Sequence, residues 1–221
     1  MTELLLLAAL GGLIAVDGVA AVQSMVSRPL VVGWLTGMIV GEPLLGAELG
    51  VLLELYLLVL VPSGGGRYPE GGTGTIVAVV AGASVAGTPA AIAFGVAGGL
   101  VWGWVGGESQ LPLRRWNERR MGSAGLEMGV RSVNRAQRAG LAADFGRGVA
   151  LTLVGSVLAR AVAPTLAGSW PISATPTATL VILGALASLG VLLRAVAHSR
   201  GRVVVFGVGL IAGAFLVGGL G

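Results

Sequence analysis

Cysteine and lysine are absent from this chain of 221 residues, and histidine occurs once. The lack of cysteine excludes disulfides, thiolate metal sites and thiol redox chemistry. A single histidine cannot build a metal site by itself, and His198 lies in an arginine-rich polar stretch, so we assign it no function. No phosphate-binding loop with a Gly-Lys-Ser/Thr ending is present, which excludes nucleotide binding of that type. The sequence therefore predicts no metal, no cofactor and no catalytic residue of its own.

Charge is also scarce. Charged residues make up 11% of the chain, hydrophobic residues make up 55%, and the mean hydropathy is +0.91. Soluble globular proteins carry roughly 25% charged residues, so no soluble fold fits this composition. A β-barrel would need segments of alternating polarity, whereas residues 4–16 and 203–220 are continuously apolar. We therefore predict an all-α integral membrane protein, a bundle of about six to eight transmembrane passes or half-passes.

Eight apolar runs are separated by short polar breaks. They are residues 4–16, 30–40, 44–61, 76–87, 90–105, 149–167, 177–196 and 203–220. Four of them are too short to cross a hydrocarbon core of ~30 Å alone. The break at residues 17–29 ends in Pro29, and another consists of Thr88 and Pro89. Such interrupted segments are typical of the discontinuous or re-entrant half-helices of transporters, and whether residues 4–16 cross or re-enter stays open.

Residues 107–148 form the one long polar segment. Its eight arginines are Arg114, Arg115, Arg119, Arg120, Arg131, Arg135, Arg138 and Arg147, against four acidic residues. The positive-inside rule places this segment in the cytoplasm and the C-terminus outside, and it explains the basic charge better than nucleic-acid binding does. The periodicity of Leu126, Val130, Val133, Leu141 and Phe145 predicts a helix within it. We thus expect an N-terminal membrane region at 1–106, a cytoplasmic amphipathic loop at 107–148 and a C-terminal three-helix membrane region at 149–221. Residues 1–3 lack the positive charge of a signal peptide.

Acidic residues inside apolar runs are the sharpest functional clue. A carboxylate at the bilayer centre costs ~2.5–3.5 kcal/mol, so it usually binds something or faces a cavity. Asp17 and Glu54 are the candidates. Glu54 has the alternative of being protonated or paired with Arg28, and Asp17 has the alternative of capping a helix.

Polar residues in the two breaks complete a candidate binding site. The first break holds Gln23, Ser27 and Arg28, and the second holds Tyr68 and Glu70. Carboxylates, amides, hydroxyls and an aromatic ring are the groups that bind sugars. Glycine repeats, at Gly33, Gly37 and Gly41 and at Gly46 and Gly50, predict close helix packing instead.

From about residue 12 to residue 75 the chain resembles the enzyme IIC subunit of the mannose/fructose/sorbose family of the sugar phosphotransferase system. The resemblance rests on Asp17 and Gln23 followed by Arg28-Pro29-Leu30, then on Leu53-Glu54, then on a glycine-rich loop ending in Pro69-Glu70. The chain departs from the family in having Glu70 where an aspartate is usual, and in being short. Residues 136–155 are only weakly similar to the family.

The resemblance implies a permease subunit in the bacterial cytoplasmic (inner) membrane that binds and translocates a hexose-type sugar. It also implies an enzyme IID membrane partner and soluble IIA and IIB proteins that carry the phosphate. The residues expected near the sugar are Asp17, Gln23, Ser27, Arg28, Glu54, Tyr68 and Glu70. Two alternatives stay open: an ion- or proton-coupled transporter of another small solute, and a non-transporting membrane partner built on the same scaffold.

Overall fold

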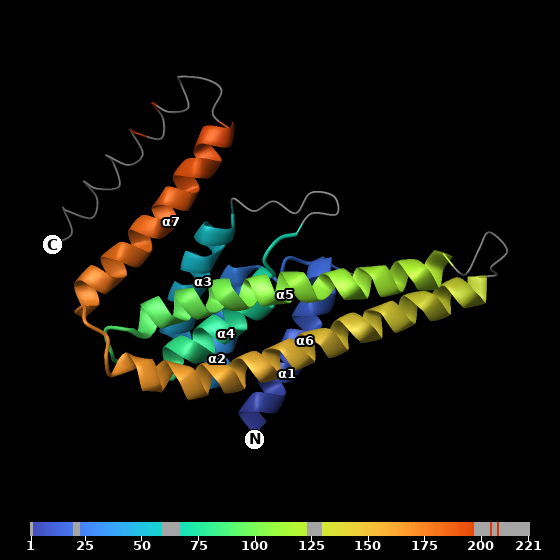
Figure 1. Cartoon of the computed structure of the whole chain (residues 1–221), viewed down its shortest axis with the longest axis horizontal. Coiled ribbons are helices and arrows are strands. Elements are labelled where there is room, and N and C mark those ends of the chain that lie inside the picture. Colours follow the sequence, from blue (N-terminus) through green and yellow to red (C-terminus); the bar gives the residue numbers. More distant parts are fainter. Residues whose placement is uncertain are drawn as a thin grey trace.

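The computed structural model describes residues 2–19, 23–58, 67–122 and 130–196, together with 204 and 207. These residues form α-helices and no strand, which confirms the predicted all-helical fold. The helices are α1 (Thr2–Val19), α2 (Pro29–Val40), α3 (Pro43–Leu57), α4 (Gly71–Ala83), α5 (Ala91–Gly122), α6 (Val130–Ala167) and α7 (Ala174–Val196), as Figure 1 shows. Several features considered in the sequence analysis lie outside the described residues: Leu126, His198, the C-terminus at Gly221, and the predicted run at 203–220 apart from residues 204 and 207.

Among the described residues, two helices are long and apolar enough to cross a membrane, at Arg131–Ala167 and Ala174–Val191. By contrast, α2 has 12 residues and α4 has 13. At 1.5 Å per residue these helices rise only ~18–20 Å, less than the ~30 Å hydrocarbon core. The breaks predicted at 17–29 and at Thr88-Pro89 are present, since α1 ends at Val19, α2 begins at Pro29, and turns at 84–90 separate α4 from α5.

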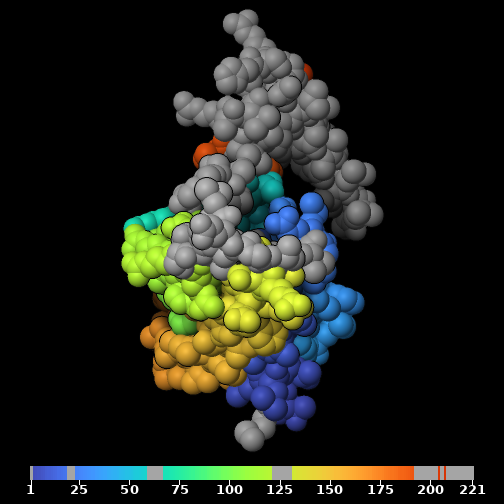
Figure 2. All heavy atoms as spheres, turned by 90° about the vertical axis from the view of Figure 1, so that its right-hand side faces the viewer, coloured from blue at the N-terminus to red at the C-terminus, as the bar shows by residue number. Residues whose placement is uncertain are grey.

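The polar segment 107–148 does not form a helix of its own. Its described residues instead continue α5 as far as Gly122 and begin α6 at Val130 (Figure 1). The hydropathy changes here, but arginine, glutamate, glutamine and leucine are all good helix formers. Helix α5 even continues through Pro112. In the end-on view of Figure 2, α6 lies between α5 and the N-terminal helices. We call residues 107–122 and 130–148 the arm.

Helix α4 is the centre of the bundle. Residues 72–82 are all buried, and α1, α2, α3, α5 and α6 all contact this helix. Its continuous apolar and small side chains, from Ile76 to Ala81, suit a helix that is surrounded on every side. Helix α7 contacts only α3 and α5 among the described helices, through contacts such as the hydrogen bond of 2.9 Å from the Tyr56 hydroxyl to the Val181 carbonyl.

Glycines allow α2 and α3 to pack with their backbones in contact. A Cβ atom on Gly33 would lie 2.7 Å from Cα of Gly50, and one on Gly46 would lie 2.7 Å from Cα of Gly37. These four glycines thus do what their spacing predicts. Gly41 does not, because it ends α2 with φ 83°, has open space around it, and donates its N–H to the Gly37 carbonyl.

The basic arm generates a topological prediction. Arg135 is exposed on the arm, and Ser169 is exposed at the turn between α6 and α7. In this cysteine-free chain, Arg135→Cys should react with a membrane-impermeant maleimide only in inverted vesicles, because arginine-rich segments stay in the cytoplasm. Ser169→Cys is the matched control and should react only in intact cells. Reaction of Arg135→Cys in intact cells would show that the orientation is the reverse.

Candidate solute-binding cavity

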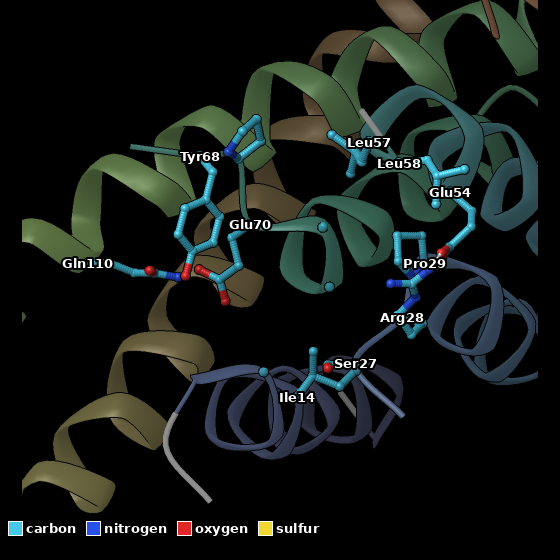
Figure 3. A pocket seen from close by; sticks show the side chains of 14 residues that line it. Ile14, Ser27, Arg28, Pro29, Glu54, Leu57, Leu58, Tyr68, Glu70 and Gln110 are labelled. Carbon is cyan, nitrogen blue, oxygen red and sulfur yellow. Dashed lines mark ion pairs between the residues drawn. The ribbon is translucent and has the colours of Figure 1, made fainter. Parts of the chain in front are cut away.

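A cavity of about 390 Å³ opens where α1 ends, α2 and α4 begin, and α3 ends (Figure 3). Volumes of roughly 300–1,000 Å³ are usual for small-molecule sites. Five of the seven sequence-predicted residues line it: Ser27, Arg28, Glu54, Tyr68 and Glu70. Its other described lining residues are Ile14, Gly18, Pro29, Leu57, Leu58, Pro69, Gly71, Gly72 and Gln110. The cavity therefore combines apolar walls with a few converging polar groups.

One wall is an ion pair at the start of α2. Arg28 precedes the helix, and its guanidinium contacts the carboxylate of Glu54 near the end of α3. The N–H of Leu30 also donates to Glu54 Oε2 at 3.4 Å. A carboxylate at a helix N-terminus satisfies a free N–H group and the positive end of the helix dipole. Glu54 thus lines the cavity and also links α2 to α3. Its pairing with Arg28 is the alternative role that the sequence analysis named for this residue.

The opposite wall is an extended segment, residues 67–70, that lies against α5 (Figure 3). The Glu70 N–H donates to the Gly103 carbonyl at 2.8 Å. A Cβ atom on Gly107 would overlap the Tyr68 carbonyl, and one on Gly106 would lie 3.0 Å from the Glu70 side chain. Only glycine permits this close approach of backbone to helix. The glycines of α5 therefore determine where Tyr68 and Glu70 are held.

Glu70 is fixed by a buried arginine of α6. Nη1 of Arg147 lies 2.5 Å from Glu70 Oε2, and Nη2 lies 3.4 Å from Oε1. Arg147 also donates to Ser109 Oγ at 3.1 Å, and its Nε lies 3.7 Å from Asp144 Oδ1. The side chains of Arg147 and Glu70 are each 9% exposed. Such a two-point contact holds a carboxylate in one orientation.

Tyr68 is held by a second arginine, Arg114, which belongs to α5. Nη2 of Arg114 donates to the Tyr68 hydroxyl and to Gln110 Oε1, both at 3.0 Å. The Arg114 guanidinium also lies over the Tyr68 ring, 5.6 Å from its centroid. This arrangement places an aromatic ring and an amide side by side at the cavity.

Asp17 and Gln23, the other two predicted residues, are not among those that line the cavity. Asp17 accepts hydrogen bonds from the Ser24 N–H and hydroxyl, each at 2.7 Å, and from the Ser27 N–H at 3.0 Å. Asp17 therefore caps backbone N–H groups of the connection between α1 and α2, and capping was the alternative role predicted for it. Gln23 is exposed and has φ 49°, and Met25 has φ 64°, so the connection has two non-glycine residues in the left-handed region. The Asp17 carboxylate stabilises this unusual turn.

Arginines balance the carboxylates of the cavity. Glu54 is paired with Arg28, while Glu70 and Asp144 lie with Arg147 and near Arg114. These six groups sum to zero formal charge. A solute with no net charge can enter such a site without creating an uncompensated charge in a low-dielectric region.

Comparison with known proteins identifies the N-terminal half. Residues 1–108 match the family of the sorbose-specific IIC component of the phosphotransferase system (EII-Sor). This confirms the resemblance to the mannose/fructose/sorbose IIC family, and all seven sequence-predicted residues lie in the matched part. IIC is the membrane permease component of that system.

The fold extends beyond the matched half. A solved structure described as that of a membrane protein has a TM-score of 0.73 at 14% identity, covering 97% of this chain and 87% of that chain. That likeness shows the fold alone. No curated protein matches the chain.

Sequence reasoning missed four residues in or near the cavity: Gln110, Arg114, Asp144 and Arg147. All four lie beyond the matched residues and in the segment predicted to be a cytoplasmic loop. The available signal was the motif at 144–148, where an aspartate and an arginine directly precede an apolar run.

The buried pair leads to a stability prediction. Arg147→Met leaves the Glu70 carboxylate buried without its partner, which should cost about 3–5 kcal/mol of unfolding free energy. Arg67→Met is the control, because Arg67 and Glu108 are 3.4 Å apart but 64% and 48% exposed, and such pairs contribute about 0–1 kcal/mol. Denaturant titration in detergent micelles measures both. Equal losses in the two variants would contradict the central role of the Arg147–Glu70 pair.

Proposed function

We propose that this chain is the membrane permease subunit of a phosphoenolpyruvate-dependent sugar phosphotransferase system, and that it binds and translocates an uncharged, hexose-type sugar. The observation that carries the proposal is the cavity, in which Ser27, Glu54, Tyr68 and Glu70 converge within the part of the chain that matches IIC components. Carboxylate, hydroxyl and amide groups there would pair with sugar hydroxyls, and the Tyr68 ring would pack on an apolar sugar face.

The charge balance favours this proposal over ion or proton coupling. A coupling carboxylate must be free to take up and release a cation during each cycle. Both carboxylates among the described lining residues, Glu54 and Glu70, are instead held by arginines. An arginine-paired carboxylate still has lone pairs for sugar hydroxyls, because each oxygen accepts more than one hydrogen bond.

The proposed subunit does not work alone. Phosphoryl transfer would take place on separate IIA and IIB proteins, and an enzyme IID subunit would be its partner in the bacterial inner membrane. Helices α2 and α4 would enter that membrane as half-helices without crossing it, since each is short and other helices of the bundle contact it. The exposed apolar side chains Leu30, Trp34 and Met38 of α2 lie one turn apart and would face lipid or this partner.

The function is tested by uptake of radiolabelled sorbose, with mannose and fructose in parallel. In a strain that lacks its own IIC subunits but has IIA, IIB and IID proteins, the chain should restore uptake, and the sugar should arrive phosphorylated. Deleting the phosphoenolpyruvate-dependent phosphate donor should abolish this uptake, while collapsing the proton gradient should not. Uptake that follows the gradient and needs no phosphate donor would establish the coupled-transporter alternative instead.

Glu54 provides a residue-level test of the same proposal. Glu54→Gln keeps an acceptor but loses the charge, so the sugar should bind more weakly by roughly the 1.5–3 kcal/mol of a hydrogen bond to a charged group. The control is Glu48→Gln, on an exposed position of the same helix, which should bind as the wild type does. Equilibrium dialysis of the purified variants gives the affinities. Unchanged affinity in Glu54→Gln would leave Glu54 a purely structural role.

A further inference from the structure

A second polar cavity lies at the other end of the bundle. It has a volume of about 350 Å³ and is lined by Glu3, Val40, Val80, Ala83, Ser84, Arg160 and Pro164. Arg160 lies within the apolar half of α6, and its guanidinium pairs with the Glu3 carboxylate in the first turn of α1. A cation in an apolar span is costly and usually marks an ion or substrate pathway.

Helices α1 and α4 both run from one cavity to the other. Helix α1 contributes Glu3 to the second cavity and Ile14 to the first. Helix α4 contributes Gly72 to the first and Val80 to the second. Glu3 and Ile14 are eleven positions apart, which in an α-helix corresponds to ~16.5 Å. The two cavities are therefore separated by a length comparable to half the hydrocarbon core.

A row of small and polar residues on α6 follows α1 over this distance. The row consists of Gly148, Thr152, Ser156 and Arg160, each four residues from the next. A Cβ atom on Gly11 of α1 would overlap Thr152 Oγ1, and one on Gly148 would overlap the Gly11 carbonyl. Ser156 lies one helical turn from Thr152 and one from Arg160. We call this contact, from Gly148 to Arg160 of α6 and from Glu3 to Ala15 of α1, the α1–α6 seam.

The hydroxyls of the seam have no partner. Thr152 and Ser156 are each 0% exposed, and among the described residues neither side-chain oxygen has a hydrogen-bond partner. Several other helical hydroxyls bond the carbonyl four residues earlier, as Thr75 does with Gly71 at 2.7 Å and Ser84 does with Val80 at 2.7 Å. The hydroxyls of Thr36 and Thr73 also have no partner among the described residues, but they do not lie on the seam. A buried hydroxyl without a partner costs about 1–3 kcal/mol, so these two are explained if another conformation satisfies them.

We propose that the α1–α6 seam is the closed part of the solute path between the two cavities. When α1 separates from α6, Thr152 and Ser156 hydrogen-bond the passing solute or its water, and the Arg160–Glu3 pair closes the far end in the conformation described here. The backbone contact at Gly11 and Gly148 allows the seam to close without a gap. This inference rests on the proposed function, because it assumes that a polyhydroxylated solute crosses.

Thiol labelling of the full chain in membranes tests whether the seam opens. Ser156→Cys should react with an impermeant methanethiosulfonate reagent about tenfold faster than Val79→Cys, because the reactive thiolate forms only where water enters. Val79 is equally buried, at 0% exposure, but packs in the apolar cluster around Leu49 and Leu53. Addition of sorbose should alter the rate at Ser156→Cys only. Equal and slow reaction of both variants would overturn the proposal.

Uptake by two hydroxyl-deleting variants separates this inference from the proposed function. Thr152→Val and Ser156→Ala should fold at least as well as the wild type, since each removes an unpartnered hydroxyl, yet transport should slow about three- to tenfold through loss of one hydrogen bond to the solute. Thr36→Val is the matched control on α2, outside the seam, because its hydroxyl is likewise 0% exposed and has no partner among the described residues. Normal uptake in the two seam variants would overturn the proposed solute path but would not contradict the proposed permease function. Absence of uptake in the wild type would instead refute the proposed function.

Discussion

The ion pair between Arg147 and Glu70 is the interaction on which the rest of the site depends. It joins α6 to the segment that precedes α4, two parts of the chain that are 77 residues apart. Because both side chains are 9% exposed, neither charge is tolerable without the other. The pair therefore fixes one wall of the cavity relative to the arm. Helix α5 completes the support through Ser109, which accepts from Arg147, and through the glycines against which the segment lies.

The cost of charge in an apolar environment also explains how the polar groups are arranged. Asp17, Glu54 and Glu70 each contact either a cation or several hydrogen-bond donors. Groups satisfied in this way are already oriented before a solute arrives, so less ordering is needed on binding. Thr152 and Ser156 are the contrasting case, since their hydroxyls lie on the seam between two cavities and have no partner in this conformation.

Sequence patterns that have a local physical cause predicted several features of the fold. The helix breaks at Pro29 and at Thr88-Pro89 and the close packing at Gly33 and Gly50 were predictable, because each follows from short-range chemistry. The partners of Glu70 and of Arg160 were not, because each pair joins distant segments and no local pattern encodes it. The described residues of segment 107–148 are helical, because a change in polarity alone does not end a helix.

A structure of the full chain with the transported sugar bound tests the central claim most directly. The account predicts that the sugar occupies the cavity between the Arg28–Glu54 pair and the Tyr68–Glu70 wall, with hydroxyl groups within hydrogen-bond distance of both glutamates and Arg147 still paired with Glu70. A sugar bound elsewhere in the bundle, with this cavity filled by water alone, would contradict it.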